Sequence, residues 1–148
     1  MSDFPSKILG LFLAFFLLVV APLTNYGLSN DLTTKRAVLN EMTNFIDKVT
    51  DVSTITEVSL ADFYLGCSSH GAIVDVKVDR YIKIVNPDGS GGTYTTYVLS
   101  DQLVSWNQGD IVKVRVQAID YTGAQRMMWY FLKLVTPKLD FELAGMVR

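Results

Sequence analysis

The chain has 148 residues, a length that suits one domain with an appendage. Charged residues make up 19% of it, against roughly 25% in an average soluble domain, and no charge occurs between Ile8 and Leu23. The 13 Lys and Arg and the 15 Asp and Glu give a net charge of −2 without clusters of either sign, which argues against a nucleic-acid partner. One Cys and one His exclude an internal disulfide and a multi-cysteine metal cage, so we expect a structural part without a cofactor rather than an enzyme.

An uncharged apolar run of 16 residues, Ile8 to Leu23, follows the tail MSDFPSK. As a helix it would be about 24 Å long, short of the roughly 30 Å hydrocarbon core of a bilayer. Counting on to Leu28 gives 21 residues, enough to span, with Tyr26 where an interfacial aromatic residue would lie. We therefore predict a membrane anchor over residues 1–28 and a head over residues 29–148. The residues expected to contact lipid or sister helices are Ile8, Leu11, Phe12, Phe15, Phe16, Leu18, Val19 and Pro22.

Two other readings of this run stay open. A cleaved signal peptide would be cut after Ala21, but Pro22 would then follow the cut directly, which signal peptidases generally refuse. A buried helix of a soluble protein is disfavoured because residues 14–18 have no polar face.

The membrane orientation is not decided by charge, because Lys7 precedes the span while Lys35 and Arg36 follow it. The flank before the span is only seven residues long, so we favour a cytoplasmic amino terminus. The expected topology is a single pass through the cell membrane with the head outside the cytoplasm.

An amphipathic helix is predicted over residues 29–51, continuous with the apolar run. Apolar side chains recur there in steps of four and three, interrupted only by Lys35. Pro22 removes a backbone donor, so we expect one long helix that bends near that residue. The stripe consists of Leu28, Leu32, Leu39, Met42, Ile46 and Val49, and the last four are candidates for contact with other subunits.

The next segments predict a short helix and then a hairpin. Ser59–Asp62 has the form of a capping box, and the helix that it opens should end before Gly71. From Ala72 apolar residues alternate with polar ones, except that Arg80 occupies an apolar position. Residues 86–92 (NPDGSGG) form the expected seven-residue loop before a second strand over residues 93–99.

The last third of the chain predicts two more strands with a helix between them. The strands cover residues 111–121 and 139–147 by alternation. Thr122–Gln125 is a second capping box, and its helix should run through Val135. The predicted fold class is thus α+β: a long apolar helix that becomes amphipathic, joined to a largely antiparallel four-stranded sheet over residues 72–148 with a helix packed on one face.

Few residues suggest chemistry. Cys67 and His70 lie one helical turn apart, but a zinc site usually needs four ligands and nucleophilic catalysis needs an orienting third group. The loop over residues 86–90 has oxygen-bearing side chains at alternate positions but lacks the closing Glu of a calcium loop. In the helix after Thr122, helical spacing assigns Ala124, Met127, Met128, Phe131 and Val135 to the core. Trp129 and Tyr130 are left to meet a partner subunit.

The order of these elements resembles the pilin-like subunits of Gram-positive type IV pilus or tight-adherence (Tad) clusters. The likeness rests on the uncharged start that runs into LTNYGLSNDLTTKRAVLNEMTNFIDKV, on ITEVSLADFYLGCSSHG before the strand GAIVDVKV, on the Asn107–Asp110 turn, and on the ending AGMVR. Type IV pilins usually have a leader cut after Gly and a Glu five residues into the mature chain. A cut after Gly10 would place Phe15 there instead.

The resemblance implies a non-enzymatic subunit or minor component of a surface filament or related secretion apparatus. Its partners would be the membrane, copies of itself, other pilin-like subunits, and an assembly ATPase and a platform protein as assembly machinery. The main alternative is a membrane-anchored binding module that acts outside the cytoplasm as a monomer. An enzyme of unrecognised type would have to join distant carboxylates such as Asp75 and Asp120.

Overall fold

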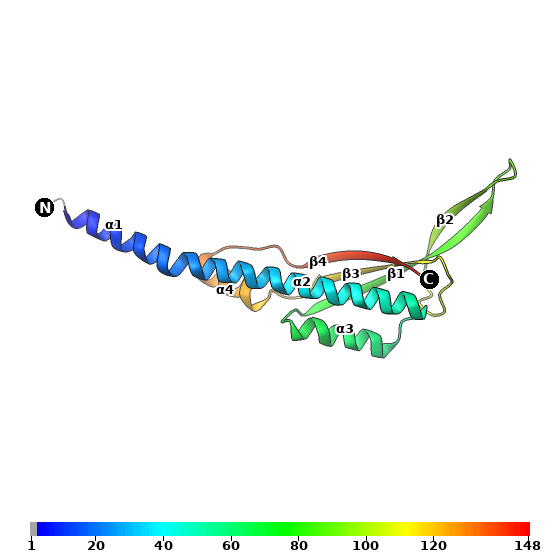
Figure 1. Ribbon diagram of the computed structural model, residues 1–148, viewed down its shortest axis with the longest axis horizontal. Coiled ribbons are helices and arrows are strands. Elements are labelled where there is room, and N and C mark those ends of the chain that lie inside the picture. The colour runs from blue at the N-terminus through cyan, green and yellow to red at the C-terminus, as the bar shows by residue number, and fades with distance from the viewer. Residues whose placement is uncertain (1–2) are drawn as a thin grey trace.

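The structure is a computed structural model that describes residues 3–148; residues 1 and 2 of the predicted anchor lie outside the described range. A long helix, made of α1 (Asp3–Phe15), η1 (Phe16–Val20) and α2 (Ala21–Val52), leads into a small head (Figure 1). The head contains α3 (Glu57–Ser69), β1 (Val74–Pro87), β2 (Thr93–Ser100), β3 (Ile111–Ala118), α4 (Gly123–Leu132) and β4 (Asp140–Met146). The predicted α+β class is confirmed.

The long helix is continuous from Phe4 to Val52, a length of 49 residues or about 74 Å. Just before Pro22 the helix widens into the π-helical turn η1, where the Ala21 N–H donates to the Phe16 carbonyl five residues earlier. Proline cannot donate the ordinary helical hydrogen bond, and π-turns are common where that ladder is interrupted. The Thr24 hydroxyl donates to the Val20 carbonyl at 2.7 Å and so supplies a further bond at this irregular turn.

Within the described residues, four strands form one antiparallel sheet in the order β2-β1-β3-β4. In its central rows Val78 lies opposite Val114, which lies opposite Leu143. The second half of α2 packs on the sheet beside α3, and together they enclose the core of the head. Gly145 of β4 lets α2 come close, because a Cβ there would lie 2.5 Å from the Ile46 Cγ2 atom.

The face that α2 presents to the head follows the predicted stripe in its second half and differs from it in its first half. Met42, Ile46 and Val49 are buried in the chain's own core, so they are not available for contact with another subunit, and Leu39 is half-buried. Closer to the anchor, the stripe is rotated: Gly27, Asp31 and Thr34 are buried, whereas Leu28 and Leu32 are exposed. Lys35 pairs with Asp31 at 2.8 Å, and the Thr34 hydroxyl donates to the His70 carbonyl, so polar groups replace apolar ones on this face.

Several element boundaries also differ from the sequence prediction. α3 begins three residues early, because Thr56 instead of Ser59 is its N-cap and shares a capping box with Ser59. The hairpin loop has five residues, 88–92, since Pro87 already pairs with Thr93. The capping box of Thr122 and Gln125 is confirmed, but α4 ends at Leu132.

Candidate functional site: an uncovered apolar helix and two apolar surfaces

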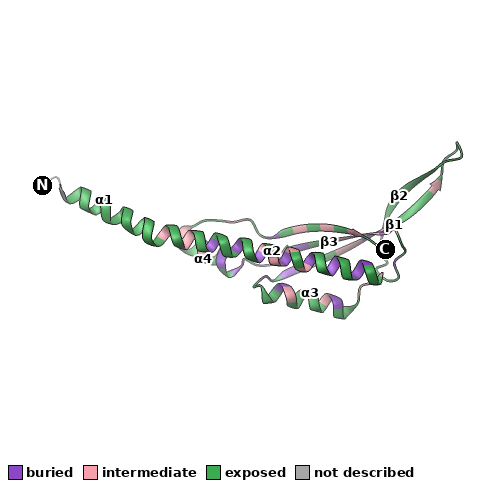
Figure 2. Ribbon diagram, in the orientation of Figure 1, coloured by how far each residue is buried: buried purple, intermediate pink, exposed green. Residues whose placement is uncertain are grey.

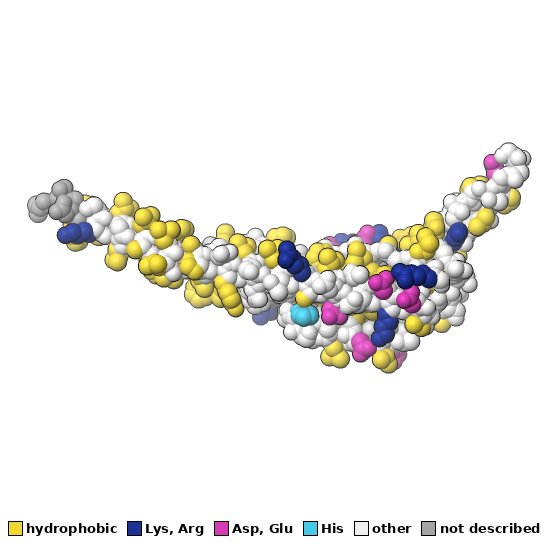
Figure 3. Space-filling model, viewed as in Figure 1, with side chains coloured by type: hydrophobic (Ala, Val, Ile, Leu, Met, Phe, Trp, Pro, Cys, Tyr) yellow, Lys and Arg dark blue, Asp and Glu magenta, His cyan; other side chains and the backbone are white. Residues whose placement is uncertain are grey.

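The apolar half of the long helix projects from the head without cover. Every residue from Phe4 to Val19 is exposed (Figure 2), and the surface there is dominated by hydrophobic side chains (Figure 3). Among the described residues, this is the one helix long and apolar enough to cross a membrane. The exposed residues include each one predicted for lipid or helix contact: Ile8, Leu11, Phe12, Phe15, Phe16, Leu18, Val19 and Pro22.

A second apolar surface lies where the head meets this projecting helix. α4 is the helix of the head nearest the amino-terminal end (Figure 1), and its buried Met128 packs on Gly27 of α2. Exposed apolar side chains of α4 and of the residues just after it form what we call the α4 surface. They are Trp129, Tyr130, Phe131, Leu134 and Val135, which are 47%, 68%, 72%, 45% and 70% exposed.

The sequence prediction for this segment was right for four residues and wrong for two. Ala124 and Met128 are buried as predicted, and Met127 is half-buried. Trp129 and Tyr130 lie outside the core as predicted, with their rings 5.2 Å apart edge to face. Phe131 was expected in the core but is exposed, because α4 buries only its Ala124, Gln125 and Met128 side against the rest of the chain. Val135 was also expected there, but α4 ends at Leu132 and Val135 lies exposed beyond it.

The α4 surface borders a cavity and carries two lysines. The cavity, of about 440 Å³, is lined by apolar groups such as Tyr121 and Leu134 and by the ion pair of Arg126 with Asp120. Lys133 Nζ lies 4.6 Å from the centre of the Trp129 ring, and Lys138 Nζ lies 4.9 Å from that of Tyr121. Both lysines therefore lie against aromatic rings of the head.

A third apolar surface is the β1–β2 arm, which we define as residues 82–98. β3 pairs with β1 only as far as Tyr81, so beyond that residue β1 and β2 form a two-stranded ribbon that projects from the opposite end of the head (Figure 1). Its exposed apolar side chains are Ile84, Val85, Tyr94, Tyr97 and Val98. A lone two-stranded ribbon is marginally stable in water, so this arm is suited to lie against a partner.

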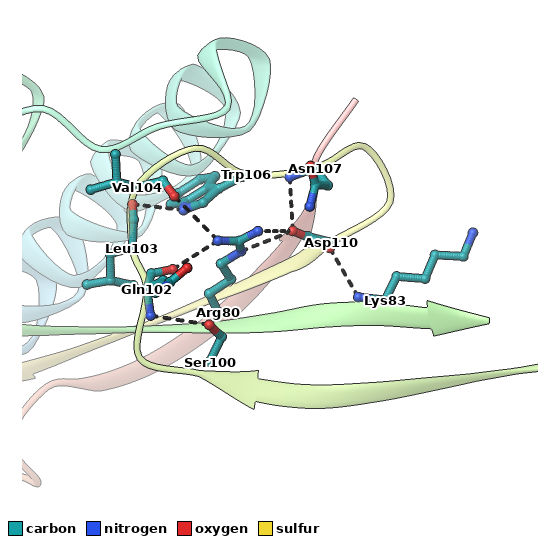
Figure 4. A network of polar contacts seen from close by, with 9 residues as sticks. All are labelled: Arg80, Lys83, Ser100, Gln102, Leu103, Val104, Trp106, Asn107 and Asp110. Atoms are coloured by element: carbon teal, nitrogen blue, oxygen red, sulfur yellow. Dashed lines mark hydrogen bonds and ion pairs between the residues drawn. The ribbon is translucent and has the colours of Figure 1, made fainter. Parts of the chain in front are cut away.

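Arg80 anchors the base of the arm through a buried polar network (Figure 4). Arg80 is 3% exposed, and its Nη2 atom lies 2.6 Å from the Oδ2 of Asp110, which is 1% exposed. Its Nη1 donates to the carbonyls of Gln102 and Val104 at 3.0 and 3.5 Å. The network thereby ties β1 to the connection between β2 and β3.

Asp110 receives donors from several directions. Burial alone would raise the pKa of its carboxyl, but backbone N–H bonds from Asn107 and Lys83, then the bond from Arg80 and its charge, lower the pKa below its usual value. The Asp110 carboxylate is therefore charged at neutral pH. Sequence reasoning noted Arg80 as an exception in the strand pattern but did not connect it with Asp110, which lies 30 residues away.

The residues that suggested chemistry are placed as parts of the fold. Cys67 is buried in the core, and burial, with the charge of Glu41, raises the pKa of its thiol to about 11, so it stays protonated near neutral pH. His70 is exposed beside Glu41, at 3.8 Å. In the hairpin loop the Ser90 hydroxyl donates to Asp88. Among the described residues no cluster of three or more metal-ligating side chains occurs.

Comparison with protein-family models, with curated proteins and with solved structures gives no match to this chain.

Proposed function

We propose that this chain is a membrane-held, pilin-like structural subunit that assembles with copies of itself, or with related subunits, through its projecting helix. The single observation that supports this most is the shape of the long helix. The carboxyl-terminal half of the helix packs in the core of the head. The amino-terminal half is apolar on every side, and no other part of the chain packs against it. Such a helix needs an apolar environment from lipid or from other helices.

Lipid and sister helices can each satisfy this helix. Its backbone groups are bonded internally apart from those at the ends and at the irregular turn before Pro22, so either environment can surround it with few polar groups unpaired. Moving the helix from a bilayer into a bundle of identical helices replaces one apolar neighbourhood by another, and close packing supplies the attraction. The subunit can therefore remain in the membrane before assembly and then join a filament, with an ATPase and a platform protein driving the transfer.

The head is suited to form the outer coat of such a filament. The sheet face away from α2 carries exposed ion pairs, Lys113 with Glu142 and Arg115 with Asp140. The β1–β2 arm extends from the end of the head opposite the apolar helix (Figure 3), so it can reach the head of a neighbouring subunit. In this role the protein has partners and no substrate.

A charge in the projecting helix tests the proposal. Leu17→Glu should abolish filaments on cells, and ordered assembly of the purified full-length chain, because an unpaired carboxylate cannot be buried between apolar helices. Leu65→Glu, at an exposed leucine of α3, is the matched control and should assemble as the wild type does. Normal assembly of Leu17→Glu would contradict the proposal.

A second candidate function is a membrane-anchored binding module that acts as a monomer, and the exposed arm favours it. In that case the full-length protein would remain a monomer in detergent at every concentration. A head lacking residues 1–27 would retain its binding activity. Concentration-dependent growth into ordered assemblies would exclude it.

A further inference from the structure

The uncovered part of the long helix is too short to cross a bilayer alone. The 16 residues from Phe4 to Val19 span about 24 Å, against roughly 30 Å of hydrocarbon. If Lys7 lies at the amino-terminal boundary with its amine in the headgroup layer, the hydrocarbon begins at Ile8. Roughly 20 helical residues are then needed, so the opposite boundary falls at Gly27.

Gly27 is the residue on which α4 rests. A Cβ at this position would lie 2.9 Å from the Met128 Cγ atom, so the two helices touch there. The α4 surface therefore stands at the depth where hydrocarbon gives way to headgroups. If the anchor spans the bilayer fully, the α4 surface must therefore contact the lipid.

The composition of the α4 surface matches that location. Residues 127–132 (MMWYFL) carry no charge, and Trp129 and Tyr130 are of the types enriched at membrane interfaces. Tyr26, exposed on α2 one residue before Gly27, adds a third such ring. Lys133 and Lys138 lie against the rings of Trp129 and Tyr121, where their amines can meet lipid phosphates.

We infer that the α4 surface is embedded in the headgroup–acyl boundary of the bilayer that holds the long helix. This inference rests on the proposed membrane anchor. Lipid is the occupant because the surface is continuous with the anchor and lies at its boundary depth. The head is then held at two points, the helix and α4, with the β1–β2 arm directed away from the membrane.

Tryptophan quenching tests this inference on the full-length chain. The protein is reconstituted into vesicles of phosphatidylcholine and phosphatidylglycerol at fewer than one copy per vesicle, with or without bromine on the upper acyl carbons. Of the two tryptophans, Trp129 is on the α4 surface, whereas Trp106 is buried beyond the far end of α2, where its backbone N–H donates to the Ser53 carbonyl and its indole N–H donates to the Leu103 carbonyl. The brominated lipid should remove most of the Trp129 emission and none of the Trp106 emission.

Two variants separate the possible outcomes. Trp129→Phe should lose the quenched component and keep the unquenched one. Phe12→Trp in the Trp129→Phe background reports on the anchor itself and should be quenched strongly. If this anchor tryptophan is quenched and Trp129 is not, the inference is overturned while the anchor stands. Blue-shifted but unquenched Trp129 emission would mean that protein covers it, which also overturns the inference. If neither is quenched, the anchor and the proposed function fail together.

Discussion

Gly27 of α2 lies directly under the thioether of Met128, so close that a Cβ on residue 27 would come within 2.9 Å of Met128 Cγ and 3.1 Å of its sulfur. This contact fixes α4 at the level where the long helix leaves the head. Glycine is a poor helix former, and its presence in mid-helix here is explained by the close approach of a neighbouring helix.

Gly27→Leu should therefore displace α4 without unfolding the sheet. Overpacking of this kind costs about 1–3 kcal/mol. Hydrogen exchange of the full-length chain in detergent should show faster exchange of the α4 amides and unchanged exchange in β3. Gly10→Leu is the control, since a Cβ at Gly10 meets nothing within 4 Å. Equal protection of α4 in both variants would mean that the Gly27–Met128 contact does not hold it.

The buried Arg80–Asp110 pair should matter far more for stability than an exposed pair in the same sheet. Arg80→Met leaves the Asp110 carboxylate buried without its cation, which costs about 3–5 kcal/mol. Arg115→Met removes the cation of the half-exposed Arg115–Asp140 pair and should have little effect, because water screens that pair. Urea unfolding in detergent measures both. Similar losses for the two variants would contradict the role assigned to burial.

The stability of the head should fall in acid through Asp110. Its pKa is lower in the folded chain than the usual value of 3.8, so the unfolded chain binds more protons. The stabilisation is complete above pH 4 to 5 and is lost as the pH drops through the folded pKa. Urea unfolding between pH 7 and pH 3 should show this decline, and Asp110→Asn should flatten it.

The pKa of Asp140 is also lowered, by hydrogen bonds from Arg115 and Gln117. Repeating the unfolding measurements at high salt distinguishes the contribution of Asp110 to the acid decline from that of Asp140. Salt screens the exposed Asp140 pair but not the buried Asp110 pair. An acid decline that disappears in high salt would assign the effect to the surface.

Shortening the β1–β2 arm should weaken assembly while leaving the stability of the head nearly unchanged. Lys83 and Tyr97 are cross-strand partners, so replacing residues 84–96 by Asn-Gly closes the ribbon with a two-residue turn. The unfolding temperature should change little, because this part of the arm lies beyond the four-stranded sheet. Assembly should weaken, since the apolar contacts are lost. Filaments at the wild-type level would show that the arm is not an assembly contact.

Strand and helix positions were predictable from the sequence where a local pattern, such as alternation or a capping box, has a single structural interpretation. The alternation in β3 and β4 reflects one face toward the core, buried in β3 and half-buried in β4, and one face toward solvent. The Thr122–Gln125 box marks the start of α4. The start of α3 was predicted at a capping box that begins at Ser59, but Thr56 is the N-cap and Ser59 is the third helical residue.

The faces at the junction of helix and head were not predictable in the same way. Hydrophobicity alone does not distinguish a side chain of the protein core from one exposed toward an external apolar partner. Among the exposed apolar residues here are Leu28, Leu32, Phe131 and Val135. The core takes up Gly27 and Met128 instead, because close helix contact needs a small residue opposite a flexible one. Arg80 and Asp110 meet only through the register of β1 and β3, which a local pattern does not contain.

Crosslinking from within the projecting helix tests whether subunits assemble through that helix. A photoreactive phenylalanine analogue replaces Phe12, which is 73% exposed, and surface material sheared from cells is irradiated. Assembly through this helix should give a ladder of dimers, trimers and larger products, and no ladder when the analogue replaces Leu65 on α3. Monomers crosslinked to lipid alone would contradict assembly through this helix.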